Sequence, residues 1–200
     1  LNGFINKKVY PFADWNRIYT IWEMSKKRTW ITSDTHFFHN RIIQYEDRPF
    51  ANAMEMNEQM IERWNSVVRK HDLVYHLGDV MLNVDADKMK GLLNRLNGDI
   101  ILISGNHDKK NFEFFKSTGR FLEIIQHKHQ MIVDNYVILS HHPIFLEKRS
   151  PFINLYGHVH ANPNYNTVSA RGACVCVERW DYTPVNYEYL VNEVASLTEW

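Results

Sequence analysis

Five short polar motifs, each at the end of an apolar run, hold the residues of this chain that could do chemistry. In order they are Asp34-Thr35-His36, Gly78-Asp79, Gly105-Asn106-His107-Asp108, Ser140-His141-His142-Pro143 and Gly157-His158-Val159-His160. Their candidate site residues are two aspartates, one asparagine and five histidines. Zinc, manganese and iron bind imidazole nitrogen together with carboxylate oxygen, so this set favours them over calcium. The motifs predict a metalloenzyme with two adjacent metal ions.

Each motif taken alone also has a purely structural explanation. A Gly-Asp pair is most often a turn, and Asn-His-Asp can form a loop or cap a helix. A single histidine such as His141 can belong to a core, and Asn106 alone would be a poor choice of ligand. All five motifs occur together, each after an apolar run, and this combination favours the functional interpretation.

The apolar runs before the motifs predict strands, and the segments between them predict helices. Strands are expected at 29–33, 73–77, 100–104, 131–133, 136–139, 153–156, 167–170 and 173–177. Apolar residues at helical spacing predict helices at 52–69, 85–96 and 112–117, and a last one from residue 186. This alternation predicts an α/β fold. Such sheets bind ligands at the carboxyl ends of their strands, where all five motifs fall.

Composition limits the classes of function. The 200 residues are enough for one domain, and 23 basic residues balance 23 acidic ones. No global field therefore draws the protein to nucleic acid or to an anionic membrane, although a local basic patch is compatible with this balance. No apolar run reaches the roughly 18 residues of a membrane span. Cys174 and Cys176 are expected to be buried, reduced thiols, which fits a cytoplasmic location.

The first residues are expected to lie outside the main domain. Met24 is followed by four polar residues and then by the first predicted strand, so it is a candidate natural start. Residues 1–23 would then be an extension, and its aromatic residues suggest that it packs on something. We therefore divide the chain into an N-terminal extension, 1–28, and a single domain, 29–200.

In this order, the five motifs resemble those of the calcineurin-like metallophosphoesterases, whose pattern runs Asp-x-His, Gly-Asp, Gly-Asn-His-Asp/Glu, His and Gly-His-x-His. The resemblance covers about residues 29–190. It is strongest to a small bacterial and phage branch, through His36-Phe37-Phe38-His39, Arg48-Pro49-Phe50 and Tyr182-Thr183-Pro184-Val185. The resemblance implies a sandwich of two mixed β-sheets flanked by helices.

The resemblance also implies a role for each motif residue. The first ion would be held by Asp34, His36 and His160, and the second by Asn106, His141 and His158. Asp79 would bridge the two, and the implied cofactors are two divalent ions, Mn²⁺, Zn²⁺ or Fe, with Mn²⁺ favoured. The implied reaction is hydrolysis of a phosphodiester or phosphomonoester by attack of a metal-bridging hydroxide. His107 would donate a proton to the leaving oxygen or stabilise it.

The chain departs from the family pattern at one position near His107. Many members carry an acid or amide three residues after the bridging aspartate, where it orients the catalytic histidine. This chain has Leu82 there. Either Asp108 or another group takes over that task, or His107 works with less help.

The expected substrate contacts are His39, Arg48 and His142. Arginine grips two phosphate oxygens with its planar fork, and His39 follows the first metal motif closely. The alternatives are a hydrogen bond to a ligand for His39 and a surface salt bridge for Arg48. His142 would contact either substrate or a ligand. Four histidines carry no motif and are expected on the surface or in the core: His71, His76, His127 and His129.

Two alternatives to a phosphoesterase remain. One is a non-catalytic, metal-binding scaffold with the same fold, and the other is a metal-dependent nuclease. The expected ligands and His107 are all present, which favours the enzyme. Its partner would be a phosphoester, such as a nucleotide or cyclic nucleotide, and no membrane is expected. The neutral net charge does not indicate nucleic acid, since binding to its phosphate backbone usually requires a basic surface.

Overall fold

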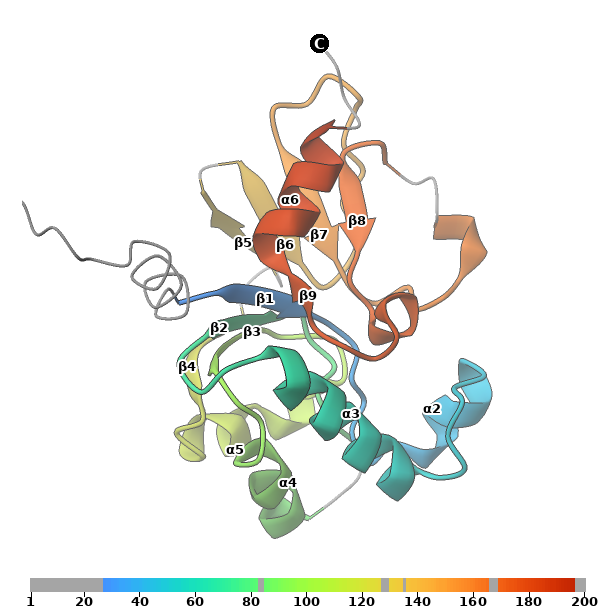
Figure 1. The fold of residues 1–200 in the computed structure, drawn as a ribbon, viewed down its shortest axis with the longest axis vertical. Coiled ribbons are helices and arrows are strands. Elements are labelled where there is room, and N and C mark those ends of the chain that lie inside the picture. Colours follow the sequence, from blue (N-terminus) through green and yellow to red (C-terminus); the bar gives the residue numbers. More distant parts are fainter. Residues whose placement is uncertain (1–26, 83–84, 127–129, 135, 166–168, 197–200) are drawn as a thin grey trace, which may run out of the picture.

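Two β-sheets pack against each other in a computed structural model that describes residues 27–82, 85–126, 130–134, 136–165 and 169–196 (Figure 1). The first sheet has the strand order β4-β3-β2-β1-β9 and the second β5-β6-β7-β8. Their strands are β1 (Thr29–Thr32), β2 (Leu73–His76), β3 (Asp99–Ile103), β4 (Phe121–Ile125), β5 (Gln130–Val133), β6 (Val137–Ser140), β7 (Ile153–Tyr156), β8 (Gly172–Cys174) and β9 (Val185–Asn186).

Both sheets are mixed, which confirms the implied sandwich. In the first sheet β1 to β4 run parallel, and β9 pairs antiparallel with β1. In the second sheet β6, β7 and β8 run parallel, and β5 pairs antiparallel with β6. Parallel strands share a carboxyl edge, so the residues that follow β1, β2 and β3 meet at one edge, and those after β6 and β7 at another.

Three helices cover the outer face of the first sheet, and the last helix packs against both sheets. The helices are α2 (Asn40–Tyr45), α3 (Ala53–Val67), α4 (Ala86–Leu93), α5 (Phe112–Ser117) and α6 (Tyr187–Ser196). The Asn52 side chain caps α3, because it accepts the backbone N–H groups of Met54 and Glu55, both at 3.0 Å. Figure 1 shows α3, α4 and α5 beneath the first sheet and α6 against the second.

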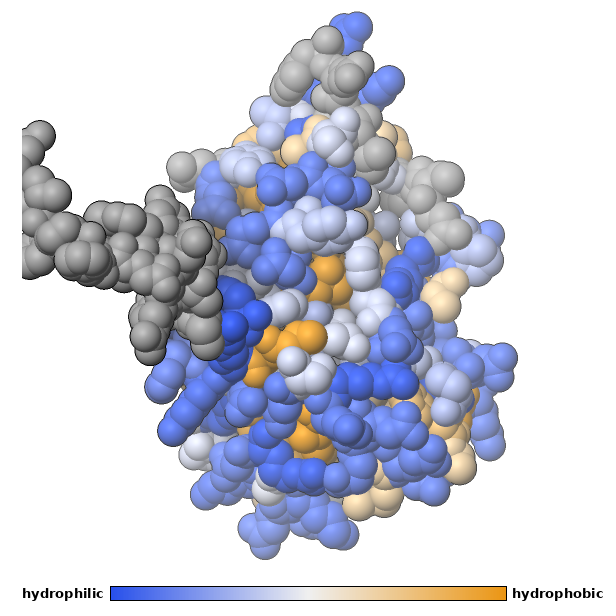
Figure 2. All heavy atoms as spheres, in the orientation of Figure 1, coloured by the Kyte–Doolittle hydropathy of each residue, from blue (hydrophilic) through white to orange (hydrophobic). Residues whose placement is uncertain are grey.

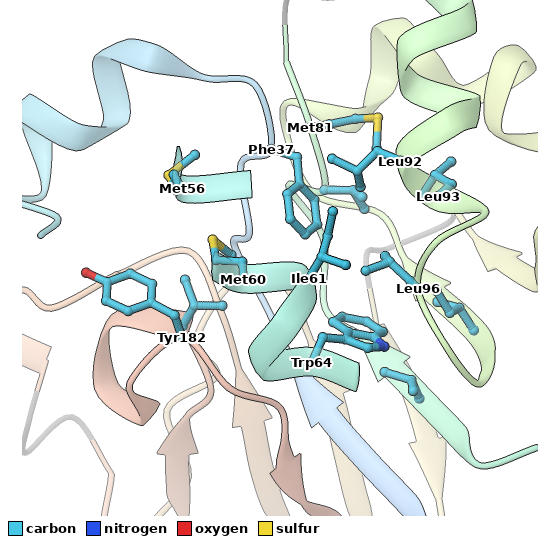
Figure 3. Close-up of a cluster of buried hydrophobic side chains, with 14 of the residues drawn as sticks. Phe37, Met56, Met60, Ile61, Trp64, Met81, Leu92, Leu93, Leu96 and Tyr182 are labelled. Carbon is cyan, nitrogen blue, oxygen red and sulfur yellow. The ribbon is translucent and has the colours of Figure 1, made fainter. Parts of the chain in front are cut away.

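Two large apolar cores and a small third one around Cys174 and Cys176 hold the described layers together. The first lies between α3, α4, α5 and the first sheet, with Trp64 and Phe37 among its fully buried side chains (Figure 3). The second joins the facing sides of the two sheets, for example Ile31 of β1 and Leu155 of β7, and extends to α6. Since Phe37 directly follows His36, the first core also anchors the first metal motif. The face drawn in Figure 2 is mostly hydrophilic, with apolar side chains in small separate patches.

Some predicted elements differ from those observed. The last predicted strand ends at Cys174 instead of 177, because the chain bends into the 3₁₀ turn Val177–Trp180. Of the strand expected at 167–170, residues 169 and 170 are not in a strand, and the rest lies outside the described residues. The helix α2 and the strands β4 and β9 were not predicted.

The remaining expectations concern the start of the chain and the cysteines. Residues 1–26, which include most of the expected extension and Met24, lie outside the described residues. Cys174 and Cys176 are buried free thiols, as predicted. Among the described residues, no helix is long and apolar enough to cross a membrane.

Candidate metal centre

The five motifs meet where the carboxyl edges of the two sheets face each other. The contact between the sheets is close because Gly157 has no side chain: a Cβ there would overlap the Ser33 hydroxyl and lie 2.5 Å from Asp34 Oδ2. Gly105 plays the same part within the first sheet, where a Cβ would overlap the Asp79 carboxylate. The glycines of two motifs therefore allow residues from different strands to approach one another.

The first candidate ligand group consists of Asp34, His36 and His160, whose ligand atoms lie within 4.8 Å of one another. Asp34 Oδ1 is 3.8 Å from Nε2 of both histidines. The other oxygen, Oδ2, accepts hydrogen bonds from Ser33 Oγ at 2.5 Å, from the His158 backbone N–H at 2.8 Å and from Cys176 Sγ at 3.3 Å. These bonds turn Oδ1 toward the histidines.

Two atoms of this group are buried without a hydrogen-bond partner among the described residues. They are Asp34 Oδ1 and His36 Nε2. A buried polar atom without a partner is costly, and in native proteins it calls for an explanation such as a bound ion. Because a carboxylate oxygen and an imidazole nitrogen are both ligands of zinc, manganese and iron, the residues present fit a divalent ion.

The second candidate group contains His141 and His158, whose ligand atoms lie with that of His142 within 4.8 Å of one another, and Asn106, which contacts His141. The His141 Nδ1–H donates to the Leu77 carbonyl at 2.7 Å, so its Nε2 carries a lone pair. That lone pair faces Asn106 Oδ1 at 2.9 Å. An acceptor facing an acceptor is the arrangement expected around a cation, and the hydrogen bond on Nδ1 fixes the tautomer as metal-binding histidines require.

Asp79 lies between the two groups. Its Oδ2 is 3.6 Å from His36 Nε2 and 3.6 Å from His141 Nε2, and its Oδ1 accepts the His107 backbone N–H at 2.9 Å. Burial, together with the neighbouring carboxylates of Asp34 and Asp108, raises the pKa of Asp79 to about 8. A cation between the two groups would counter the repulsion that raises this pKa.

The backbone of these motifs is strained at the candidate ligands. Asp34, His36, Asp79, His158 and His160 all have positive φ, between 48° and 70°. Non-glycine residues rarely adopt this left-handed conformation, which costs of order 1–3 kcal/mol each and persists where the surroundings enforce it. Because such strain gathers at functional sites, its presence at five candidate ligands supports a role for these positions beyond packing.

The buried histidines differ in charge. Burial lowers the pKa of His36 to about 4, so the imidazole is neutral, as a metal ligand must be. Burial also acts to lower the pKa of His160, but its hydrogen bond to Glu178 and the charges of Asp34 and Glu178 outweigh this and raise it to about 9. Burial lowers the pKa of His76 to about 3, and His76 stacks on Trp64 in the first core, as expected of a histidine without a motif.

His107 lies at the open side of the centre, with 45% of its side chain exposed. Its Nε2 is 3.9 Å from Asp79 Oδ2, and its ring contacts the ring of His36 edge-on, with 5.5 Å between centroids. Asp108 does not orient this ring, because it accepts backbone N–H groups instead. Beside His107 is a cavity of about 330 Å³, lined by Leu82, Asp85, Met89, Asn106, His107, Lys110 and Asn111.

The three expected substrate contacts lie in different surroundings. His39 lies against His36, with 3.4 Å between their Nδ1 atoms. The ring centroids of His142 and His158 are 4.2 Å apart. The ligand atom of His142 lies within 4.8 Å of those of His141 and His158. Arg48 is buried behind the first ligand group, and each of its N–H groups contacts a protein atom. The interpretation of Arg48 as a phosphate clamp does not agree with these contacts.

Sequence reasoning missed two residues of this region. Glu178 accepts a hydrogen bond from His160 Nδ1 at 2.9 Å, and Ser33 donates to Asp34. No local pattern marks Glu178, which follows the buried cysteines and precedes the Tyr-x-Pro-Val motif. Its partner Arg48 was singled out because it belongs to a motif, although for a different role.

The chain is similar in sequence to a known protein family and to individual proteins. The family model described as calcineurin-like phosphoesterase superfamily domain matches residues 28–178. An uncharacterized protein of Methanocaldococcus jannaschii is 37% identical over 174 residues, which are 84% of this chain and 92% of that protein. The gene 66 protein of Mycobacterium phage L5 is 33% identical over 109 residues, half of each chain.

One solved structure has a similar fold. It is a protein of unknown function from Aquifex aeolicus, which aligns with a TM-score of 0.63 at 22% identity and covers 84% of this chain and 100% of its own.

Proposed function

Because this chain belongs to the calcineurin-like phosphoesterase superfamily, we propose that it hydrolyses a phosphodiester or phosphomonoester at a centre of two divalent metal ions. The observation that carries the proposal is the place of Asp79, whose Oδ2 lies 3.6 Å from one histidine of each ligand group. A carboxylate in this position can serve both groups, and its charge offsets the repulsion between two cations.

The residues of the chain divide the work of binding the ions. Asp34, His36 and His160 would hold the first ion, and Asn106, His141 and His158 the second. Bound ions of this type supply an activated water and neutralise charge on the phosphoryl oxygens. We favour Mn²⁺ among Mn²⁺, Zn²⁺ and Fe, because the donors are imidazoles, carboxylates and an amide, without thiolates.

His107 is the proposed partner of the leaving group. Its side chain is half-exposed at the open side of the centre and borders the cavity beside Leu82, so a substrate oxygen can reach its ring. A histidine in this position can donate a proton as the phosphorus–oxygen bond breaks. No side chain among the described residues hydrogen-bonds to this ring, so of the alternatives left by Leu82 we favour a His107 that works with less help.

The substrate is proposed to be a small phosphoester, such as a nucleotide or cyclic nucleotide. The cavity of about 330 Å³ beside His107 has the size of a small-molecule pocket, and Lys110 in its lining can pair with a negative group. The balanced net charge of the chain does not favour a long nucleic acid. The proposed substrate contacts are His39, whose ring lies beside that of His36, and His142, whose ring lies beside that of His158.

The proposal can be tested with metal-free protein and two generic substrates, a nitrophenyl monoester and a bis-nitrophenyl diester. We expect cleavage to depend on added Mn²⁺, to stop with a chelator, and to accompany the binding of two ions per chain. A preference for the diester would direct the search toward cyclic nucleotides. Two bound ions without cleavage of either ester would contradict hydrolysis and favour the scaffold, and a single ion would contradict the dinuclear centre.

We also propose a cytoplasmic location, because Cys174 and Cys176 are buried free thiols, as expected in a reducing compartment. Fractionation of the source cells with an antibody against the chain tests this. Recovery of the protein outside the cytoplasmic fraction would contradict it.

A further inference from the structure

We propose that Arg48 and Glu178 form a buried positioning pair that holds His160 and the Asp34–His36 segment in the geometry needed to bind the first ion. The inference rests on the proposed metal centre and adds to it two residues that touch neither an ion nor substrate. The pair joins motifs that lie far apart in the sequence, since Arg48 begins Arg-Pro-Phe and Glu178 lies just before Tyr-x-Pro-Val.

Glu178 controls His160. Its Oε1 accepts a hydrogen bond from His160 Nδ1 at 2.9 Å, which keeps a proton on Nδ1, so that Nε2 is the ring nitrogen that would give up its proton to bind an ion. That Nε2 is 3.8 Å from Asp34 Oδ1, the unpartnered atom of the first ligand group. A carboxylate that receives the other ring N–H of a metal-binding histidine fixes the orientation of the ring and makes it a stronger ligand.

Arg48 controls both Glu178 and the backbone beside it. Its Nε and Nη2 donate to Glu178 Oε1 at 2.9 and 2.6 Å, so the oxygen that accepts the His160 N–H is itself held by two charged donors. Nη2 also donates to the Asp34 carbonyl at 2.8 Å, and Nη1 to the Thr35 carbonyl at 2.9 Å. These two carbonyls belong to the segment in which Asp34 and His36 have left-handed backbones.

The pair is shielded from water and braced by aromatic side chains. The Arg48 side chain is fully buried, and that of Glu178 is 3% exposed. The guanidinium lies 5.8 Å from the Tyr182 ring centre, and Tyr182 packs edge-on against Phe50 at 4.8 Å. The two family motifs, Arg-Pro-Phe and Tyr-x-Pro-Val, thus form one unit around the ion pair. Lysine cannot replace this arginine, because a single ammonium cannot reach the carboxylate and both carbonyls in one plane.

The primary test is the metal affinity of Glu178→Gln, measured on metal-free protein by competition with a chromophoric chelator for Mn²⁺ and Zn²⁺. Glutamine keeps the size of the side chain but removes the charge. We expect the affinity for one ion to fall about 10- to 100-fold, as for other residues that orient a ligand, and the affinity for the other ion to stay unchanged. Arg48→Lys should lower the affinity for the same ion.

A matched control is Asp72→Asn. Asp72 is also a buried carboxylate paired with an arginine, Arg28, which donates in addition to a backbone carbonyl, but this pair lies at the amino end of β1. Its loss should destabilise the fold and leave both ion affinities unchanged. This control separates a role in positioning the ligands from general stability.

The outcomes distinguish this inference from the proposed function. If wild-type protein binds two ions and Glu178→Gln binds both equally well, the positioning pair is disproved and the proposed function stands. The positioning pair would also be disproved if Glu178→Gln lowered the affinity for both ions equally, or if Asp72→Asn lowered an ion affinity as well. If wild-type protein binds no ion, the proposed function fails and the inference fails with it.

Discussion

The buried carboxylate of Asp108 accepts a hydrogen bond of 2.7 Å from the backbone N–H of Asp79. The same carboxylate accepts the backbone N–H groups of Gly105 at 2.7 Å and Val80 at 3.0 Å. By accepting three backbone N–H groups, this one side chain joins the loop after β2 to the loop after β3. Asp108 therefore fixes the place of Asp79 between the two ligand groups.

Replacing Asp108 with Asn should destabilise the protein by about 2 kcal/mol, because an amide NH₂ would then face a backbone N–H in a buried site. Urea unfolding of metal-free protein measures this change. Asp85→Asn is the matched control: Asp85 caps α4 at the surface, and asparagine caps helices equally well. If the Asp108→Asn protein is as stable as wild type, the carboxylate does not hold these loops together.

Asp79→Asn should bind less metal and lose most activity. The substitution keeps the shape of the side chain but removes the negative charge between the two ligand groups. We expect a loss of at least about 100-fold in ion affinity, at the upper end of what is seen for residues that only orient a ligand. Metal analysis and hydrolysis of the bis-nitrophenyl diester check this. Unchanged turnover would disprove the bridging role.

His107→Ala should keep both ions and slow hydrolysis by about 10²–10⁴-fold, the usual contribution of a general acid. The loss should be greatest for esters with poor leaving groups, because these need the proton most. A series of substituted phenyl esters measures this dependence. The control is His71→Ala, because His71 is exposed and lies just before β2. An equal loss of rate for all esters in His107→Ala would argue against proton donation.

Leu82→Trp should fill part of the cavity beside His107 and raise the KM for the bis-nitrophenyl diester about tenfold, with metal content unchanged. The control is Met54→Trp, in a second cavity of about 410 Å³ between α3 and α4. If the first substitution leaves KM unchanged, the cavity does not receive the leaving group.

Acid should destabilise metal-free protein partly through His76. Its Nδ1 accepts the Gly78 N–H, and its Nε2 faces the Thr35 hydroxyl, which itself donates to the Val80 carbonyl, so the buried ring is neutral. Burial lowers the folded pKa to about 3, while the unfolded chain binds a proton near 6.5. This group's contribution is complete above pH 6.5 and declines by about 1.4 kcal/mol per unit as pH falls toward 3.

Denaturant unfolding between pH 7.5 and 4 measures this slope. His76→Gln should show a shallower decline than wild type, although it is less stable at pH 7.5. His71→Gln should follow the wild-type slope, because His71 is exposed. Equal slopes for all three proteins would show that His76 does not govern the acid response.

Most of the strands could be predicted because each motif ends an apolar run, and α3 could be predicted because its periodicity is strong, whereas the two-sheet sandwich came from the family resemblance. The sequence was not sufficient for β9, whose two residues are too few to show a pattern, or for β4, where Leu122 and Glu123 face solvent and interrupt the apolar run. The end of β8 was missed because Val175 and Val177 extend the apolar pattern beyond the last strand residue.

The candidate ligands could be named from the sequence, but their supports could not. Asp34 and His36 stand in a recognisable motif, whereas the Arg48–Glu178 contact joins residues 130 positions apart. Only the packing of the 3₁₀ turn Val177–Trp180 beside the first motif brings them together. For the same reason Arg48 was assigned to the substrate, since an arginine near a metal motif gives no sign of which way it points.

Both proposed ion sites draw ligands from both sheets: Asp34 and His36 follow β1 and Asn106 follows β3, while His141 follows β6 and both His158 and His160 follow β7. Each bound ion would therefore act as a non-covalent cross-link between the two sheets, and the first, from Asp34 to His160, would close a loop of most of the domain. Closing a long loop in the folded state alone favours folding. Metal loading should slow amide hydrogen exchange even in strands that supply no ligand, such as β5 and β8, because the two sheets could then separate only if the ions were released.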